Sequence, residues 1–375
     1  MTPPPMPHIL FIWDQFGPYH MDRCEALGLA LAGRACVTGI ELSATSATYA
    51  WDITGPGRQF CKRTLFGKVP AETLSIWAVS LALAKEVSRP EVETIFVSGY
   101  ERPSHFLIAV LARIRGKRVI VMLDSKYDDK PRQAWLETAK RMLMSPYQGG
   151  FAAGQRSADY LRLLGLRERL VTLGYDTVSL SRIRALAINE LPLSWDDRPF
   201  VAVARYVPKK NLGFLLEAYA TFVATNPPST RRLVLCGGGP LDEELQAAAL
   251  RLGISDRVDF TGFVGQKEVA RLLKEAICLL LPSIEEQWGL VVNEALAFAL
   301  PVIASPAVGA TDTLVIDNDN GFLRAPDDRK GWVEAMERIG MDRALWHHMS
   351  RRSAELSPLG DVSAFVQGVI PHLSQ

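Results

Sequence analysis

Short apolar runs rich in β-branched residues alternate with longer segments of helical periodicity through both halves of the chain. This alternation is typical of parallel sheets, because parallel strands need a crossover connection and a helix supplies it. The pattern restarts at residue 200, after an irregular stretch at 174–193. We therefore expect an α/β chain with two similar units, a linker in that stretch, and a cleft between the units.

The expected elements follow the hydrophobic pattern. Strands are expected at residues 8–13, 35–42, 94–98, 118–123, 149–153, 200–204, 232–236, 258–261, 276–281 and 301–304. Helices are expected at residues 20–32, 71–87, 104–115, 132–143, 212–225, 241–252, 266–274, 290–299 and 330–339. One more helical pattern follows these, at residues 362–373.

The composition excludes several classes of protein. At 375 residues and 48% apolar content, the chain is long enough for two buried cores. A net charge of +1 gives no basic excess with which to neutralise a nucleic-acid backbone. The five cysteines are widely spaced and odd in number, which favours reduced thiols in a cytoplasmic protein over a disulfide framework or a zinc site.

No segment indicates insertion into a membrane. The first residues, MTPPPMPHILFIW, lack a basic region before their short apolar run, so we expect a first strand and no signal peptide. No apolar run approaches the roughly 20 residues that span a bilayer. A soluble or peripheral membrane protein is therefore expected.

The segment 282–305, PSIEEQWGLVVNEALAFALPVIAS, is the strongest functional indicator. It leads from a buried strand to a helix that begins near Leu290, and open α/β sheets bind ligands at such loops. Free backbone amides at 289–291 would face an anion. Glu286 and Glu294 flank this place, where carboxylates are suited to holding neutral hydroxyls. A nucleotide-sugar meets both demands; the alternative is a pair of solvated carboxylates at a helix start.

Three further loops of the second half follow expected strands. Arg205, Lys209 and Lys210 could offset the charge of a diphosphate, although such cations also suit a solvated turn. The glycines at 237–239 let a backbone approach a ligand closely, or form a tight connection to the next helix. The exposed backbone of the segment DFTGF at 259–263 could face a nucleobase, with an ordinary strand-end turn as the alternative.

In this order the motifs resemble those of the retaining glycosyltransferases of family 4, which have the GT-B fold of two facing Rossmann-like domains. The resemblance covers most of residues 195–325. Its motifs are VARYVPKKN at 203–211, LVLCGGGPL at 233–241, VDFTGFV at 258–264, PSIEEQWGLVVNEA at 282–295, and LPVIAS followed by VGATDTL and NGFL. It implies an acceptor-side domain at 1–180, joined by a C-terminal helix at about 357–375, and a donor-binding domain at 190–356.

The resemblance also implies roles for residues. Glu294 would hold the ribose hydroxyls of the donor nucleotide, and Glu286 would contact the donor sugar without acting as a covalent nucleophile. Arg205 and Lys210 would bind the diphosphate and stabilise its charge as it leaves, so neither a metal nor another cofactor is expected. The further donor-binding residues implied are Gly17, Gly238, Gly289, Leu290 and Phe263.

The chain departs from the family pattern at a few positions. The family usually has glycine where Ala299 stands, which concerns close packing more than chemistry. After Gly309 the family commonly has a second glycine and then a glutamate, where this chain has Ala310 and Thr313, with Asp312 nearby. None of these changes touches the expected phosphate or ribose contacts.

The resemblance is weaker in residues 1–180, the half expected to meet a variable acceptor. Gly17 stands where relatives carry two glycines near the donor phosphate, and His20 could orient an acceptor, stabilise the diphosphate or cap the helix. Asp124 could bind a sugar hydroxyl or help to position the acceptor, or it could cap the next turn. Residues 100–102 would also face the cleft.

The predicted function is retaining, metal-independent transfer of a sugar from a nucleotide-diphosphate sugar to a glycan or lipid-linked acceptor in bacterial surface polysaccharide synthesis. Basic clusters at 62–68 and 113–118 could attract anionic lipids, although solvated faces are the simpler interpretation. We expect a cytoplasmic protein, with peripheral contact at the inner face of the membrane as an option. The alternatives are another GT-B enzyme, such as a nucleotide-sugar epimerase or a disaccharide phosphorylase, and a non-catalytic partner of a transferase.

Overall fold

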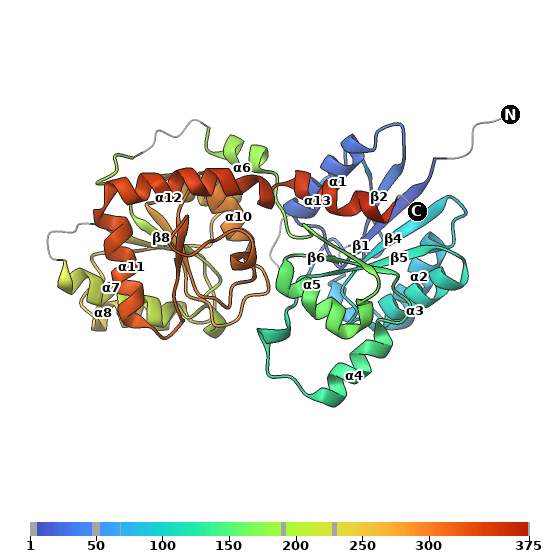
Figure 1. Ribbon diagram of the computed structural model, residues 1–375, viewed down its shortest axis with the longest axis horizontal. Coiled ribbons are helices and arrows are strands. Elements are labelled where there is room, and N and C mark those ends of the chain that lie inside the picture. Colours follow the sequence, from blue (N-terminus) through green and yellow to red (C-terminus); the bar gives the residue numbers. More distant parts are fainter. Residues whose placement is uncertain (1–5, 47–52, 68, 189–192, 227–230, 374–375) are drawn as a thin grey trace. The chain divides into compact units, whose positions relative to one another are not determined.

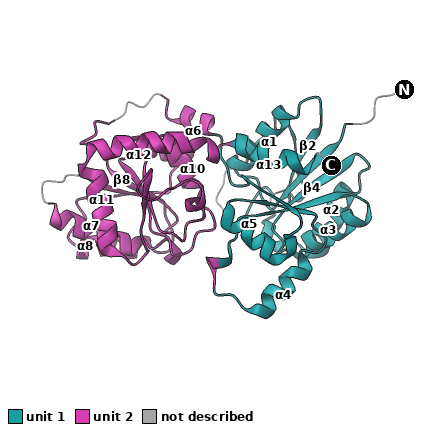
Figure 2. Ribbon diagram, viewed as in Figure 1, with its two compact units in different colours: residues 1–127, 131–179, 362–375 teal, residues 128–130, 180–361 magenta. Residues whose placement is uncertain are grey.

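The computed structural model describes residues 6–46, 53–67, 69–188, 193–226 and 231–373 (Figure 1). It divides into two compact units (Figure 2). Unit 1 comprises residues 1–127, 131–179 and 362–375, and unit 2 comprises residues 128–130 and 180–361. Each unit has one parallel sheet with helices packed on it, so the expected α/β class with two Rossmann-like sheets is confirmed.

Within the described residues, the sheet of unit 1 has seven parallel strands in the order β3-β2-β1-β4-β5-β6-β7. They are β1 (His8–Trp13), β2 (Cys36–Glu41), β3 (Cys61–Thr64), β4 (Val92–Ser98), β5 (Arg118–Leu123), β6 (Gly149–Ala152) and β7 (Leu170–Leu173). From β1 the chain winds outward to β2 and β3 and then returns to β4 on the other side. The winding therefore reverses between β1 and β4, and loops at such a switch point commonly bind ligands.

Helices cover both faces of this sheet. They are α1 (Pro18–Ala30), α2 (Ile76–Val87), α3 (Pro103–Ile114), α4 (Ala134–Leu143), α5 (Gln155–Leu161) and α13 (Val362–Val369). Because side chains of a strand alternate between the two faces, Phe11 packs with Leu27 of α1 and Phe365 of α13. Leu10 lies in the opposite core, with Leu83 of α2. The C-terminal segment is thus part of unit 1.

Over the described part of unit 2, six parallel strands run in the order β10-β9-β8-β11-β12-β13. They are β8 (Phe200–Val203), β9 (Leu233–Cys236), β10 (Val258–Gly262), β11 (Cys278–Leu281), β12 (Val302–Ala304) and β13 (Gly321–Leu323). The helices are α6 (Leu180–Leu186), α7 (Leu212–Thr225), α8 (Asp242–Arg251), α9 (Gln266–Glu275), α10 (Leu290–Ala297), α11 (Arg329–Met341) and α12 (Arg343–Leu356). Here the switch point lies between β8 and β11.

The structure differs from the expected elements where the hydrophobic pattern is weak. β3 and β7 lie at the edges of their sheet and contain only exposed and half-buried residues, so burial selects no apolar run in them. The predicted linker contains α6, whose Leu180 and Ile183 are buried and which packs against α9 and α10. Helix α12 was not expected, because only Met349 and Ser353 of its residues are buried.

The cysteines and the helix lengths can be compared with the expectations of reduced thiols and of no membrane-spanning segment. All five cysteines lie in the described residues and are free; Cys24, Cys236 and Cys278 are buried, whereas Cys61 is exposed on β3. Among the described residues, no helix has the length and apolar content needed to cross a bilayer.

Candidate active site

In unit 2, the loops after β8 and β11 meet at the switch point of the sheet. Lys210, at the end of a 3₁₀ turn after β8, forms an ion pair with Glu286 in the loop after β11. The backbone N–H of Ile284 donates to the carbonyl of Lys209 at 2.9 Å, which ties the two loops together. The structure therefore brings a predicted cation and a predicted carboxylate from separate motifs into direct contact.

This ion pair is largely shielded from solvent. The side chains of Lys210 and Glu286 are 12% and 13% exposed, so their attraction is screened less than that of a surface pair. Ser283 Oγ also donates to Glu286 Oε2 at 3.3 Å. A lysine ammonium has three donor hydrogens, so Lys210 can contact a phosphate while it keeps a hydrogen bond to Glu286.

The start of α10 borders the same place. Gly289 precedes the helix with φ 96° and ψ 67°, a left-handed conformation that glycine adopts at little cost. A Cβ on Gly289 would lie 3.4 Å from Cγ of Glu286, which places the helix start beside the ion pair. The first N–H groups of a helix have no partner within it, so Leu290 and its neighbours offer donors to an anion.

Helix α10 contains two consecutive buried polar residues, Asn293 and Glu294. Asn293 is structural, because its Oδ1 accepts from Trp288 Nε1 at 2.9 Å and its Nδ2 donates to the carbonyl of Gly360 at 3.0 Å. Glu294 is 6% exposed. Burial raises the pKa of Cys236 at the end of β9, and the negative charge of Glu294 contributes to that rise. Glu294 therefore lies close to the glycine loop that follows β9.

The glycine loop is fixed by close approach of other backbone segments. Gly237 has φ 139°, and a Cβ there would lie 1.9 Å from the carbonyl oxygen of Ala204, so only glycine fits. The N–H of Tyr206 donates to the carbonyl of Gly238 at 2.9 Å. A Cβ on Gly238 would lie 4.0 Å from the backbone nitrogen of Phe263, whose side chain is 70% exposed. The loops after β8, β9 and β10 are thus joined at one edge of the sheet.

Arg205 lies in the loop after β8 with an exposed side chain. It is one residue before Tyr206, whose backbone is joined to the glycine loop. The reach of Arg205 toward a diphosphate remains a prediction.

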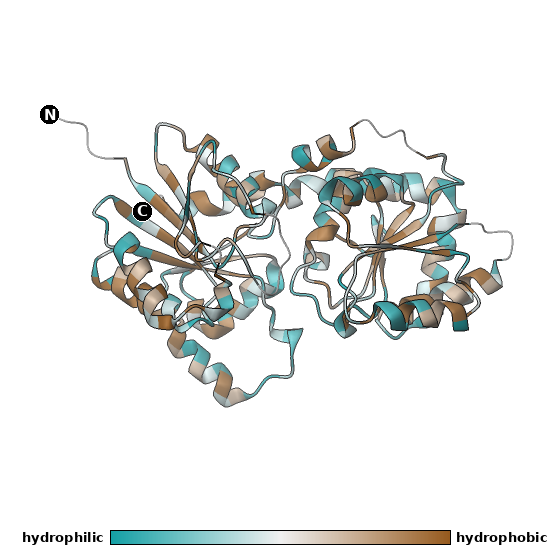
Figure 3. Ribbon diagram, turned by 180° about the vertical axis from the view of Figure 1, so that it is seen from behind, coloured by the Kyte–Doolittle hydropathy of each residue, from teal (hydrophilic) through white to brown (hydrophobic). Residues whose placement is uncertain are grey.

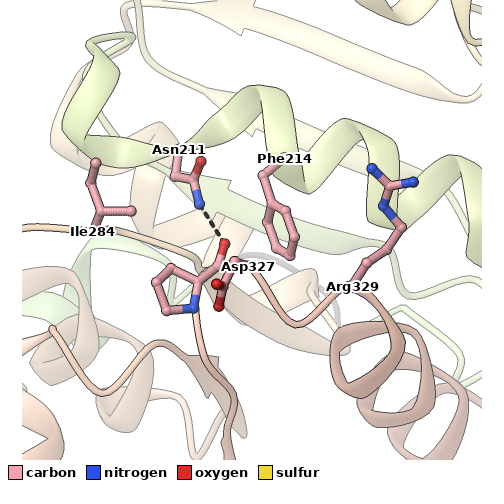
Figure 4. Close-up of a pocket in the computed structure, with 6 residues that line it drawn as sticks. Asn211, Phe214, Ile284, Asp327 and Arg329 are labelled. Carbon is pink, nitrogen blue, oxygen red and sulfur yellow. Dashed lines mark hydrogen bonds between the residues drawn. The ribbon is translucent and has the colours of Figure 1, made fainter.

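An open pocket of about 600 Å³ adjoins the ion pair without containing it (Figure 4). Its lining residues are Asn211, Phe214, Ile284, Pro326, Asp327 and Arg329. Asn211 Nδ2 donates to the carbonyl of Pro326 at 2.8 Å and so joins two of its walls. Because Lys210, Glu286 and Glu294 are absent from this lining, we place the candidate site at the switch point and not in the pocket.

Unit 1 has its own ion pair at the corresponding place. Asp14 follows β1, and Arg102 precedes α3 in the loop after β4; Arg102 Nη2 lies 2.8 Å from Asp14 Oδ2. Residues 100–102 were expected to face a cleft, but Asp14 was not singled out. Its position directly after a central strand is the signal that could have identified it.

His105 is buried beside this ion pair. Its Nδ1 lies 3.1 Å from the carbonyl of Ser98, so a neutral ring donates from Nδ1 and leaves Nε2 as an acceptor. Burial lowers the pKa of His105 to about 4, which keeps the ring neutral at neutral pH. His105 Nε2 faces Asp14 Oδ1 at 3.9 Å, and both atoms are buried without a hydrogen-bond partner in the described structure. Two acceptors therefore face each other with no donor between them.

The other predicted residues of unit 1 have structural contacts. The N–H of Gly17 donates to His20 Nδ1 at 2.9 Å, which is the capping geometry left open by the sequence. Burial and the charge of Arg23 lower the pKa of His20. The carbonyl of Asp124 accepts from Ser157 Oγ at 2.8 Å. Acceptor binding by His20 and Asp124 stays a prediction.

Residues 186–356 match the sequence model of the family Glycosyl transferases group 1. This part of the chain is therefore similar to a glycosyl transferases group 1 domain, and it includes both partners of the Lys210–Glu286 ion pair.

The similarity to individual proteins is partial in sequence and extensive in structure. D-inositol 3-phosphate glycosyltransferase of Streptomyces avermitilis is 35% identical over 178 residues, which are 46% of this chain and 38% of that protein. The chain thus spans about two fifths of the length of this curated relative. Sucrose-phosphate synthase of Thermosynechococcus elongatus has a TM-score of 0.73 at 18% identity, covering 97% of this chain and 98% of its own.

A second structural relative has been determined with a nucleotide. HepE of Anabaena in complex with UDP has a TM-score of 0.71 at 19% identity, covering 98% of this chain and 100% of its own. At these identities the likeness establishes the fold, which is that of the GT-B glycosyltransferases.

Proposed function

We propose that the chain is a glycosyltransferase that transfers a sugar from a nucleotide-diphosphate sugar to a glycan or lipid-linked acceptor, with retention at the anomeric carbon. The observation that carries this proposal is the shielded Lys210–Glu286 ion pair, which lies beside a helix start at the switch point of a unit similar to a group 1 domain. The setting we propose is bacterial surface polysaccharide synthesis on the cytoplasmic side of the membrane.

Unit 2 would bind the donor. Glu294, buried near the glycine loop, would accept hydrogen bonds from the ribose hydroxyls, and Phe263 beside Gly238 would contact the nucleobase. Lys210 and Arg205 would contact the diphosphate together with the first amides of α10. The complex of HepE with UDP supports a uridine nucleotide as the first donor class to test.

The charges at the switch point suit departure of a diphosphate. The acceptor hydroxyl oxygen would form a bond to the anomeric carbon as the bond from that carbon to the phosphate oxygen breaks on the same face. The hydroxyl proton would pass to the departing phosphate oxygen. Lys210 and the amides of Gly289 and Leu290 would stabilise the developing negative charge, the task that a metal ion performs elsewhere. Glu286 would hold donor-sugar hydroxyls, and no metal is part of this proposal.

Unit 1 would bind the acceptor. Asp14 Oδ1 and His105 Nε2 are two unpartnered acceptors at the other switch point, so a hydroxyl that donates a hydrogen bond fits their chemistry. His20 and Asp124 are the further acceptor contacts that we propose. The acceptor class remains the broader one, a glycan or a lipid-linked molecule.

Donor binding can be tested by thermal stability. A ligand that binds the folded chain at about 100 times its Kd stabilises it by roughly 3 kcal/mol, so UDP-, GDP- and ADP-sugars can be compared by their effect on Tm. We expect at least one donor to raise Tm of the wild-type chain and Glu294→Ala to abolish that rise. A wild-type chain that responds to no nucleotide-sugar would contradict the proposal.

Together with Glu294→Ala, two further carboxylate variants separate donor binding from turnover. Glu286→Ala should keep donor binding and lose most transfer or sugar selectivity, because it removes the partner of Lys210. Glu285→Ala is the matched control, since Glu285 is the adjacent residue and lies 3.5 Å from Lys209. Product analysis completes the test: an epimerised nucleotide-sugar without acceptor, or a requirement for free phosphate, would replace the transferase proposal.

A further inference from the structure

Helices α2 and α3 of unit 1 carry an apolar strip on the side that faces away from the sheet. Trp77 and Leu81 are each 77% exposed and lie four residues apart on α2, hence on one face of that helix. Ile114, at the end of α3, is 79% exposed. The two helices pack against each other and cover the same face of the sheet, as Figure 1 shows, and Figure 3 shows apolar segments on this side of unit 1.

An outer helix of an α/β unit normally turns polar residues to solvent. Here the strip continues with Ile76, which is 43% exposed, and Leu107, which is 41% exposed. The sequences of α2 and α3 include one carboxylate, Glu86, which is 4% exposed and pairs with Arg63 and Arg89. The exposed surface of the two helices therefore offers apolar side chains and cations, but no carboxylate of these helices.

The cations gather at one end of the strip. Helix α2 leads into β4 and α3 leaves it, so the two helices run in the same direction and their C-terminal ends are neighbours. Lys85 lies at that end of α2, and Arg113 and Arg115 lie at that end of α3; all three are exposed. Burial lowers the pKa of Arg169, and the positive charge of Arg113 contributes to that lowering, so positive potential accumulates there.

We propose that this face of unit 1 binds the surface of a bilayer that contains anionic lipids. Trp77, Leu81 and Ile114 would enter the boundary between headgroups and acyl chains, where an indole ring is favoured. Lys85, Arg113 and Arg115 would contact lipid phosphates. The two helices expose apolar side chains and cations but no carboxylate. This combination complements an anionic membrane surface better than a protein surface of mixed charge.

In the basic cluster at 62–68, Lys68 lies outside the described residues, and the two described cations are paired within unit 1. Lys62 pairs with Glu41 at 2.8 Å and Arg63 with Glu86 at 2.7 Å, so both cations are used inside unit 1. In the second cluster, Lys117 donates to the carbonyl of Arg89 at 3.0 Å. Arg113 and Arg115 are the cations of that cluster that remain directed to solvent.

The strip also begins near the switch point of unit 1. Arg102, which pairs with Asp14, donates to the carbonyl of Ala71 at 3.2 Å, five residues before α2 begins at Ile76. A bilayer on this face would therefore lie close to the candidate acceptor residues. Binding to a membrane surface does not require the proposed transfer reaction, so it can be tested without donor or acceptor.

Vesicle sedimentation with the full chain tests the proposal. We expect the wild-type chain to sediment with vesicles of phosphatidylcholine mixed with phosphatidylglycerol, but weakly with phosphatidylcholine alone. The double variant Trp77→Glu, Leu81→Glu should bind about tenfold more weakly, because it removes two apolar anchors. Arg113→Gln with Arg115→Gln should weaken binding and reduce its dependence on salt.

The control variant makes the same kind of substitution, an exposed leucine to glutamate, on a helix of unit 2. Leu250 on α8 of unit 2 is 71% exposed, so Leu250→Glu should leave vesicle binding unchanged. Because all the substituted side chains are exposed, the variants should keep the wild-type Tm. A wild-type chain that fails to bind the anionic vesicles, or a Trp77, Leu81 variant that folds and binds them like wild type, would overturn the proposal. A failed donor screen with intact vesicle binding would reject the proposed function alone.

Discussion

The two units place an ion pair at the same topological position but with opposite polarity. In unit 2 the loop after β8 supplies the cation, Lys210, and the loop after β11 supplies the acid, Glu286. In unit 1 the loop after β1 supplies the acid, Asp14, and the loop after β4 supplies the cation, Arg102. The winding of each sheet reverses between these strands, so the fold brings the loops together and the sequence decides which charges they carry.

The surroundings of the two ion pairs differ more than the pairs themselves. Lys210 and Glu286 are both about one-eighth exposed and lie beside the start of α10, which suits them to negative charge on a ligand. Asp14 has a side chain 47% exposed, but its Oδ1 is buried opposite the neutral His105. The switch point of unit 2 thus offers hydrogen-bond donors and positive charge to a ligand, whereas that of unit 1 offers hydrogen-bond acceptors.

The largest expected effect lies in unit 2. Lys210→Met should lower kcat by roughly 10²–10³-fold, because one positive group would be missing where charge develops on the departing phosphate. Lys209→Met is the control: Lys209 is the adjacent lysine, and its partner Glu285 is 3.5 Å away. Steady-state transfer kinetics with both variants would check this. Equal losses in the two variants would mean that Lys210 acts only through the general positive charge of its loop.

Lowering the pH should destabilise the folded state of unit 1 before that of unit 2. Burial lowers the pKa of His105 and of His372 to about 4, and it lowers the pKa of His20 as well; within the described residues, these three histidines lie in unit 1. An unfolded histidine titrates near 6.5, so the unfolded state takes up protons that the folded state excludes. The stability is fully present above about pH 6.5 and is lost as the pH falls toward 4.

The expected loss is large enough to measure. From about pH 7 to about pH 5, each of the two histidines with a pKa near 4 should cost roughly 2 kcal/mol of unfolding free energy. Hydrogen exchange at the two pH values, followed by segment, would separate the units. His105→Gln should reduce the pH dependence of unit 1, and an acid-induced opening confined to unit 2 would contradict the prediction.

The sequence predicted much of unit 2 because its candidate site residues occur in short motifs that each follow a buried strand. Lys210 and Glu286 are 76 residues apart, yet both could be named, since β8 and β11 have clear apolar runs. Their direct contact could not be predicted, because it depends on strand order. That order follows from packing over the whole sheet and not from local periodicity.

Unit 1 was harder to predict for physical reasons. His105 lies inside α3, where a histidine on the buried face has no local sequence signature. Asp14 resembles an ordinary aspartate in a loop until Arg102, 88 residues away, is seen to contact it. The edge strand β3 was not predicted, because an edge strand buries few residues and its sequence therefore has no apolar run.

Replacing the carboxylate of Asp14 tests whether unit 1 binds the acceptor and unit 2 the donor. Asp14→Asn should raise the KM for the acceptor by about tenfold without changing donor affinity, because an uncharged amide replaces the carboxylate whose Oδ1 has no hydrogen-bond partner among the described residues. Glu93→Gln, at an exposed position of β4, should leave both parameters unchanged. Donor affinity by thermal shift and acceptor KM by transfer kinetics would distinguish them. A loss of donor affinity in Asp14→Asn would assign this aspartate to the donor.

The smallest expected effect concerns the helix start in unit 2. Gly289→Ala should lower the unfolding free energy by about 1–2 kcal/mol, because φ 96° disfavours a side chain and the new Cβ would lie 3.2 Å from Val308 Cγ1. Gly213→Ala on α7 is the control with the opposite sign: a Cβ there meets no neighbour within 4 Å, so alanine should stabilise that helix by roughly 0.5–1 kcal/mol. Urea unfolding of both variants measures the difference. If Gly289→Ala were as stable as wild type, the left-handed conformation would not constrain the loop that presents Glu286 to Lys210.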